Sequence, residues 1–134
     1  MSEDPENQLR EEFLREFHPL HKRWVNIGLG PDRGLYGEPF KRKADAIVDT
    51  GNELILYEFK LRLSPGSVGQ MELYAQLLPD TPILQAVLDK PRRLVIVAGQ
   101  LAPDIVALAN AKGIEVKLYD PLWVLQYLKD KDTR

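Results

Sequence analysis

The chain has 134 residues, a length that suits one domain with a core of its own. It contains no cysteine, which excludes disulfides and thiolate metal sites. The formal net charge of −2 argues against a protein that coats nucleic acid, although a local basic patch would still let an enzyme hold it. We see no signal-peptide pattern and no apolar run near the roughly 20 residues of a membrane helix, so we expect an intracellular, cytoplasmic protein without membrane contact.

The N-terminal segment predicts an amphipathic helix over residues 6–25. Its apolar side chains recur at helical spacing: Leu9, Phe13, Phe17, Leu20 and Trp24. Pro19 is expected to kink this helix or to split it near His18. His18 and His21 point away from the centre of the apolar stripe, and we expect both to be exposed.

Residues 26–40 are rich in glycine and proline, which predicts a loop, with room for a short edge strand. The loop is longer than an ordinary connection, which indicates a binding loop near a functional site.

Two apolar runs then flank a turn centred on residues 50–51, the pattern of a β-hairpin. Asp45 lies on the first strand, and Glu58 and Lys60 lie two apart on the second, so the latter two share a face. With a two-residue loop, Asp45 would lie opposite Leu56. By parity it would then point to the same face as Glu58 and Lys60, whereas an odd-length loop would need a bulge to restore this.

The second strand is apolar on both faces up to Glu58, which is typical of a central strand covered on both sides. A glutamate and a lysine at the end of such a strand lose their hydration unless they are paired or bound to a cation. The alternative is a solvated strand face with alternating charges, which fits poorly with this pattern.

A Ser-Pro-Gly-Ser sequence at residues 64–67 ends the hairpin and predicts a helix to about Leu78. Gln70 and Tyr74 are four residues apart and share one face of it. The alternative is a core tyrosine beside a solvated glutamine, with the core face supplied by Leu73, Leu77 and Leu78. The remaining pattern predicts a short helical segment, a strand, a helix, a strand and a last helix at residues 83–88, 94–98, 104–112, 114–118 and 121–128.

The order of these residues resembles the PD-(D/E)XK nuclease superfamily, which carries an acid on one strand, Glu-x-Lys on the next, and then a helix. Its RecB-like branch adds Gln-x-x-x-Tyr on that helix. Asp45, residues 58–60 and residues 70–74 match these motifs, and the resemblance covers about residues 12–97. It implies a single α/β domain over residues 1–134. This domain has a restriction-endonuclease-like core, a mixed central β-sheet flanked by helices, and an extra C-terminal strand and helix.

The resemblance also implies a nuclease that depends on Mg²⁺ or Mn²⁺ and hydrolyses phosphodiester bonds, with DNA as the expected substrate. Asp45, Glu58 and the backbone carbonyl of Phe59 would hold the metal. Lys60 would hold or activate the attacking water. Gln70 and Tyr74 would complete the catalytic set.

Further site residues are expected around this set. A helix-borne glutamate often adds a metal ligand in this family, and Glu16 and Glu12 are the candidates, with a solvated surface glutamate as the alternative. Basic residues beside the proposed site are expected to contact nucleic acid: Lys41, Arg42, Lys43 and Arg62.

Two other functions stay open. The domain could be a non-catalytic module that keeps this fold and binds nucleic acid or a protein, in which case it needs no metal. It could also be a junction resolvase, which would form an obligate two-fold dimer because two strands must be cut symmetrically. The small size of the domain makes a homodimer or a larger DNA-processing complex plausible.

Overall fold

The computed structural model describes residues 4–31 and 42–133. Their strands form one mixed sheet in the order β1-β2-β3-β4-β5. The strands are β1 (Lys22–Gly28), β2 (Lys43–Asp49), β3 (Leu54–Arg62), β4 (Arg92–Gln100) and β5 (Ile114–Leu118). β1, β2 and β3 pair antiparallel, whereas β4 and β5 run parallel to β3.

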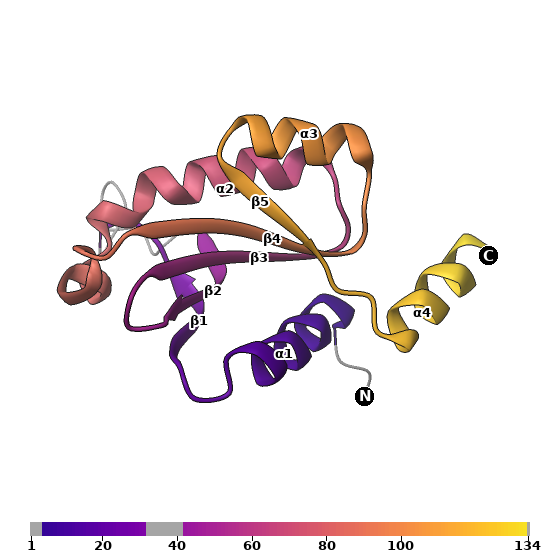
Figure 1. The fold of residues 1–134 in the computed structure, drawn as a ribbon, viewed down its shortest axis with the longest axis horizontal. Helices are drawn as coiled ribbons and strands as arrows, with labels where there is room; N and C mark the ends of the chain where they lie inside the picture. Colours follow the sequence, from indigo (N-terminus) through magenta and orange to yellow (C-terminus); the bar gives the residue numbers. More distant parts are fainter. Residues whose placement is uncertain (1–3, 32–41, 134) are drawn as a thin grey trace.

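Helices cover both faces of this sheet. They are α1 (Pro5–Phe17), α2 (Pro65–Leu77), α3 (Pro103–Ala111) and α4 (Leu122–Asp132), with short 3-10 turns η2 (Leu78–Asp80) and η3 (Pro82–Val87). Figure 1 shows α2 and α3 on one side of the sheet, and α1 and α4 on the other. The predicted α/β class is confirmed, including the extra C-terminal strand and helix. No helix in the described part of the chain is long and apolar enough to span a bilayer.

β3 is central and buried on both faces, as its sequence predicts. Leu54 and Leu56 pack towards α2 in one apolar cluster. Ile55, Tyr57 and Phe59 pack towards α1 in a second cluster. Any polar group on this strand therefore has to find its partners inside the protein.

The N-terminal helix is shorter than predicted. It begins after Asp4, whose Oδ1 accepts from the backbone N–H of Glu6 at 2.8 Å, and it ends at Phe17. Pro19 cannot continue the helix because its ring would clash with the preceding turn. Leu20 is 95% exposed, and Trp24 lies in strand β1, so neither belongs to the helix stripe.

His18 is also different from its prediction, because it is buried rather than exposed. It lies directly after α1, where its Nε2 is 2.7 Å from the hydroxyl of Tyr57 and its Nδ1 is 2.8 Å from Nδ1 of His21. His21 is exposed, as predicted.

The hairpin between β2 and β3 has a four-residue loop in place of a two-residue one, because Asp49 pairs with Leu54. Gly51 takes a left-handed φ of 95°, and its N–H donates to Asp49 Oδ1 at 2.8 Å, which tightens the turn. The register is therefore shifted by two residues, and Asp45 falls in line with Glu58 instead of Leu56. Because the shift is an even number of residues, Asp45 still points to the same face of the sheet as Glu58 and Lys60.

α4 reaches the sheet through a close approach at Gly99. A Cβ atom on Gly99 would lie 2.5 Å from Cγ1 of Val124 and 2.9 Å from the carbonyl oxygen of Leu61. The helix buries Val124 and Leu128, while Leu122 stays 69% exposed. α4 also runs one turn further than predicted, to Asp132.

Candidate active site

Asp45 sits where strands β2 and β3 part. Their backbone pairing ends at Ala46 and Tyr57. A continued ladder would direct the N–H of Phe59 to the backbone of Ala44. Instead, this N–H donates to Asp45 Oδ2 at 2.8 Å. The carboxylate is thereby fixed between the two strands, half-buried.

The neighbouring strand β1 is irregular at the position opposite Asp45. The register places Asn26 of β1 opposite Asp45, and Asn26 has a left-handed φ of 52°. Trp24 and Ile27 both pack in the cluster under α2, although an odd separation would put them on opposite faces of a regular strand. Such non-glycine strain concentrates at functional sites.

Glu58 is the buried carboxyl of the site. It is 3% exposed, and its Oε2 has no hydrogen-bond partner among the residues that the structure describes. Burial raises the pKa of Glu58 to about 9, and the neighbouring Asp45 carboxyl adds to the rise while Lys60 opposes it. Two carboxyls thus share one enclosed place, as the sequence predicts, with a lysine beside them.

Lys60 lies two residues further along β3, half-buried on the same face. Beyond it the strand ends at a cavity of about 310 Å³, which Lys60 lines together with Glu6 and Arg62. The site is therefore open to a ligand on the Lys60 side, while the Glu58 side is closed.

Glu6 is the residue of α1 that the sequence reasoning missed. Its Oε2 accepts from the backbone N–H of Leu61 at 3.3 Å, and its charge contributes to the raised pKa of Glu58. The two glutamates that were predicted lie elsewhere. Glu12 accepts from the indole N–H of Trp123, and Glu16 hydrogen-bonds Tyr119.

No spacing signal separates these three glutamates. The choice depends on how α1 lies across the sheet, and that is set by the packing of Leu9, Phe13 and Leu14 on β3. With the first turn of α1 at the end of β3, the glutamate nearest the helix start is the one whose charge acts on Glu58.

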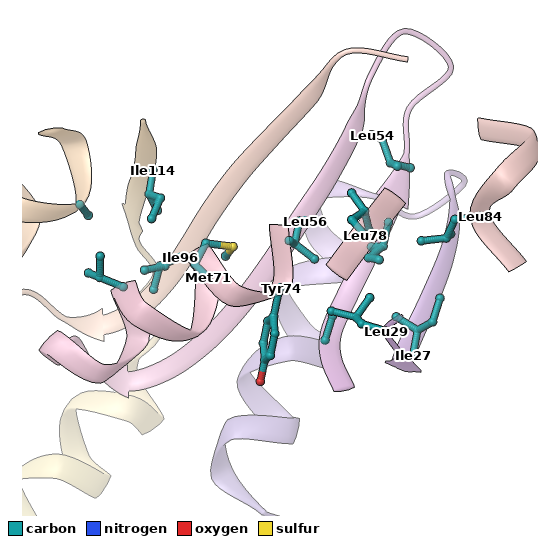
Figure 2. Packing of buried hydrophobic residues seen from close by; sticks show 14 of the residues in the cluster. Ile27, Leu29, Leu54, Leu56, Met71, Tyr74, Leu78, Leu84, Ile96 and Ile114 are labelled. Carbon is teal, nitrogen blue, oxygen red and sulfur yellow. The ribbon is translucent and has the colours of Figure 1, made fainter. Parts of the chain in front are cut away.

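Tyr74 comes from α2 and is buried at 7% exposure. Figure 2 shows its ring among the apolar side chains and its hydroxyl directed away from them. Burial raises the pKa of Tyr74, and the charges of Glu58 and Asp45 add to the effect. The predicted partner on the same helix face, Gln70, is exposed. The apolar core residues of α2 are Val68, Met71 and Tyr74, and Leu78 of η2 continues them.

The basic residues that the sequence predicts for nucleic-acid binding lie at two different positions around the carboxyl pair. Arg42 and Lys43 are exposed at the start of β2, and Arg42 is near enough to lower the pKa of Tyr74. Arg62 is exposed at the end of β3 and forms an ion pair with Asp132 of α4. Lys41 lies outside the described residues.

The carboxyl pair fits a small hard cation. In the described part of the chain, no three histidine, aspartate or glutamate side chains are gathered as a metal cage. Mg²⁺ does not need one, because it keeps several waters and uses one or two carboxylates. The oxygen of Glu58 without a hydrogen bond and the crowding of two acids are both relieved by a cation placed between them.

Solved structures share the fold of this chain. The chain is similar to a repair endonuclease from Pyrococcus abyssi, with a TM-score of 0.59 and 17% identity over 90% of this chain and 49% of the other. It is similar to EndoMS in a complex with dsDNA2, with a TM-score of 0.56 and 16% identity over 90% and 47%. The chain therefore shares its fold with these two structures.

A third similar structure is the protein of unknown function AF1548, with a TM-score of 0.56 and 9% identity over 84% of this chain and 57% of the other. The chain spans about half the length of the first two structures. No family model matches the sequence, and no curated protein matches it. The similarity is therefore one of fold, and the chemistry has to be argued from the residues.

Proposed function

We propose that the chain is a metal-dependent nuclease that hydrolyses phosphodiester bonds of DNA, and that it belongs to the RecB-like branch of the PD-(D/E)XK superfamily. The observation that carries the proposal is Glu58, a buried carboxyl beside a second carboxyl, with one oxygen that has no hydrogen-bond partner in the described structure. The fold shared with a repair endonuclease and with EndoMS, which was solved in a complex with dsDNA2, supports DNA as the substrate.

Asp45, Glu58 and the backbone carbonyl of Phe59 would hold Mg²⁺ or Mn²⁺. When bound, such an ion neutralises phosphate charge and lowers the pKa of a coordinated water. The protein's own part is to hold the ligands in place. The N–H of Phe59 fixes Asp45, and the surrounding core fixes Glu58, so neither has to reorganise on binding. Glu6 is placed to act on the same site from α1.

Lys60 would act on the reacting phosphate. Its ammonium lies on the face of β3 that carries Glu58 and borders the open cavity. From there it can hold the attacking water and oppose the negative charge that grows on the phosphate oxygens. As an ammonium it gives three donors on a flexible stem, so one group can serve both contacts.

Tyr74 and Gln70 would assist from α2. The hydroxyl of Tyr74 braces the carboxyl pair, whose charges already act on its pKa. Gln70 is exposed, which suits an amide that contacts the substrate or its water. Arg42, Lys43 and Arg62, with Lys41 beyond the described residues, would neutralise backbone phosphates on either side.

The proposal is tested by incubating the protein with Mn²⁺ and labelled single-stranded, duplex, flap and branched DNA. We expect cleavage of at least one substrate, with none after chelation of the metal. Lys60→Ala should abolish cleavage, which also controls for a contaminating nuclease. Metal-independent binding without cleavage would instead support the binding module, and equal cleavage by Lys60→Ala would overturn the assignment.

A further inference from the structure

The cavity at the end of β3 has a cationic lining. Its charged and polar side chains are Glu6, Lys60, Arg62, Ser64 and Lys131, and its volume is about 310 Å³. The lining has three cations and one carboxylate, which accepts from the N–H of Leu61, and Asp132 outside the lining pairs with Arg62. A cavity with this excess of positive charge favours an anion.

The cavity continues directly from the proposed catalytic centre. Glu58, Lys60 and Arg62 alternate along one face of β3, so each step along that face is about 6.6 Å. This step is comparable with the distance between successive phosphates of one nucleic-acid strand. A strand whose reacting phosphate lies at Glu58 and Lys60 would place its neighbouring phosphate near Arg62.

α4 brings the third cation to this place. Its burial of Val124 and Leu128 and the hydrogen bond from Trp123 to Glu12 hold the helix against α1 and the sheet. Figure 1 shows α4 beside the start of α1. Lys131 consequently lines the cavity, whereas Lys129 of the same helix lines a different one, next to Gly99.

Arg62 already holds a carboxylate at this place. Its guanidinium pairs with Asp132, the last residue of α4, and both side chains are about half exposed. An exposed pair of this kind contributes little stability. A phosphate can therefore replace the carboxylate at the guanidinium, with stronger bidentate hydrogen bonds.

From these observations we propose that the cavity between β3, the start of α2 and the end of α4 binds a second backbone phosphate of the substrate strand. Lys131 and Arg62 are its main ligands, Ser64 adds a hydroxyl, and Asp132 competes for Arg62 when no strand is bound. The proposal rests on the nuclease function above and adds α4 to the substrate-binding surface.

The test measures binding of fluorescein-labelled single-stranded and duplex DNA by anisotropy, in Ca²⁺ to suppress cleavage, at several salt concentrations. Lys131→Gln should weaken binding by about three- to tenfold for all sequences and lower the salt slope by about one. Lys129→Gln removes the same charge from the same helix and should change affinity less than twofold. Asp132→Asn should tighten binding, because Arg62 is released.

The outcomes separate the two proposals. Equal weakening by Lys131→Gln and Lys129→Gln, or an unchanged affinity of Asp132→Asn, overturns the phosphate subsite while leaving a wild-type nuclease intact. If the wild-type protein neither binds nor cleaves any DNA, the nuclease proposal itself fails. Circular dichroism melting of each variant shows whether α4 remains docked. A Lys131→Gln protein that melts like the wild type and binds like it also overturns the subsite.

Discussion

Tyr57 and Glu58 are neighbours on β3, point to opposite faces of the sheet, and are both buried. The hydroxyl of Tyr57 lies 2.7 Å from Nε2 of His18. Glu58 has an oxygen without a hydrogen bond in the described structure and a second acid, Asp45, beside it. The polar group on the α1 face of β3 therefore has a hydrogen-bond partner, whereas the carboxyl on the opposite face has an oxygen without one among the described residues.

The difference indicates what each group is for. Burial lowers the pKa of His18 to about 4, with His21 adding to the effect, and burial raises the pKa of Tyr57 to about 12. Both groups are therefore neutral near pH 7, and their hydrogen bond joins α1 to the sheet. A buried carboxyl oxygen without a hydrogen bond, next to a second acid, costs free energy, so the retention of Glu58 is explained by a ligand that completes the pair.

The largest expected effect comes from Glu58→Gln, which keeps the shape and removes the acid. We expect cleavage to fall by at least about a thousandfold, because a metal ligand is lost. The free energy of unfolding should change by no more than about 1 kcal/mol, because the raised pKa keeps Glu58 neutral near pH 7 without a metal, and a neutral amide of the same shape takes its place. Cleavage rates and urea unfolding measure the two effects.

The matched control for Glu58→Gln is Glu53→Gln on the same hairpin, whose carboxylate pairs with Arg93 at the protein surface. It should leave cleavage unchanged. A Glu58→Gln protein that loses several kcal/mol of stability along with its activity would show that Glu58 is structural, like Tyr57.

A pair of tyrosine variants sharpens the comparison between faces. Tyr57→Phe leaves Nε2 of buried His18 without a partner, and we expect a loss of about 1 to 3 kcal/mol in unfolding free energy with cleavage retained. Tyr74→Phe should show the reverse pattern, with a smaller loss of stability and at least about a tenfold loss of cleavage. Identical patterns for the two variants would contradict the division of roles.

A smaller effect is expected in the pH dependence of stability. His18 has a lowered pKa in the folded state, so between pH 6.5 and pH 4 the unfolded chain binds a proton that the folded chain does not. The contribution of His18 to stability should therefore fall as the pH falls through this window, by about 1 to 2 kcal/mol after allowance for screening. The raised pKa of Glu58 has the opposite effect on stability, so urea unfolding at pH 7 and pH 4.5 compares the wild type with His18→Gln, and the difference between them measures the His18 contribution.

His18→Gln should remove this contribution. His21→Gln should retain most of it, because burial and not His21 is the main cause of the shift. If both variants change the profile equally, burial is not the main cause of the lowered pKa of His18.

The sequence predicted what depends on local pattern. The doubly apolar run at β3, the parity of Asp45 with Glu58 and Lys60, and the C-terminal strand and helix all follow from alternation and turn chemistry. The face to which Asp45 points depends only on whether the register shift is even or odd. The longer hairpin loop shifts the register by two residues, so Asp45 stays on the face of Glu58.

What the sequence did not predict depends on how elements pack. The burial of His18 follows from the chain's turn at Pro19 and from the hydroxyl that β3 presents there. The placement of Glu6 instead of Glu12 or Glu16 follows from the position of α1 on the sheet. The sequence left two orientations of Gln70 open, and its exposure follows from the rotation of α2, whose core face takes Met71 and Tyr74. Periodicity alone does not fix these contacts.

The central claim is that Asp45 and Glu58 together bind one divalent cation, and Mn²⁺ binding followed by electron paramagnetic resonance tests it most directly. Titration of the wild-type protein without DNA should show saturable loss of the free Mn²⁺ signal at one site. Asp45→Asn and Glu58→Gln should each lose this site, while Glu53→Gln keeps it. Equal Mn²⁺ binding by the wild type and both site variants would contradict the account.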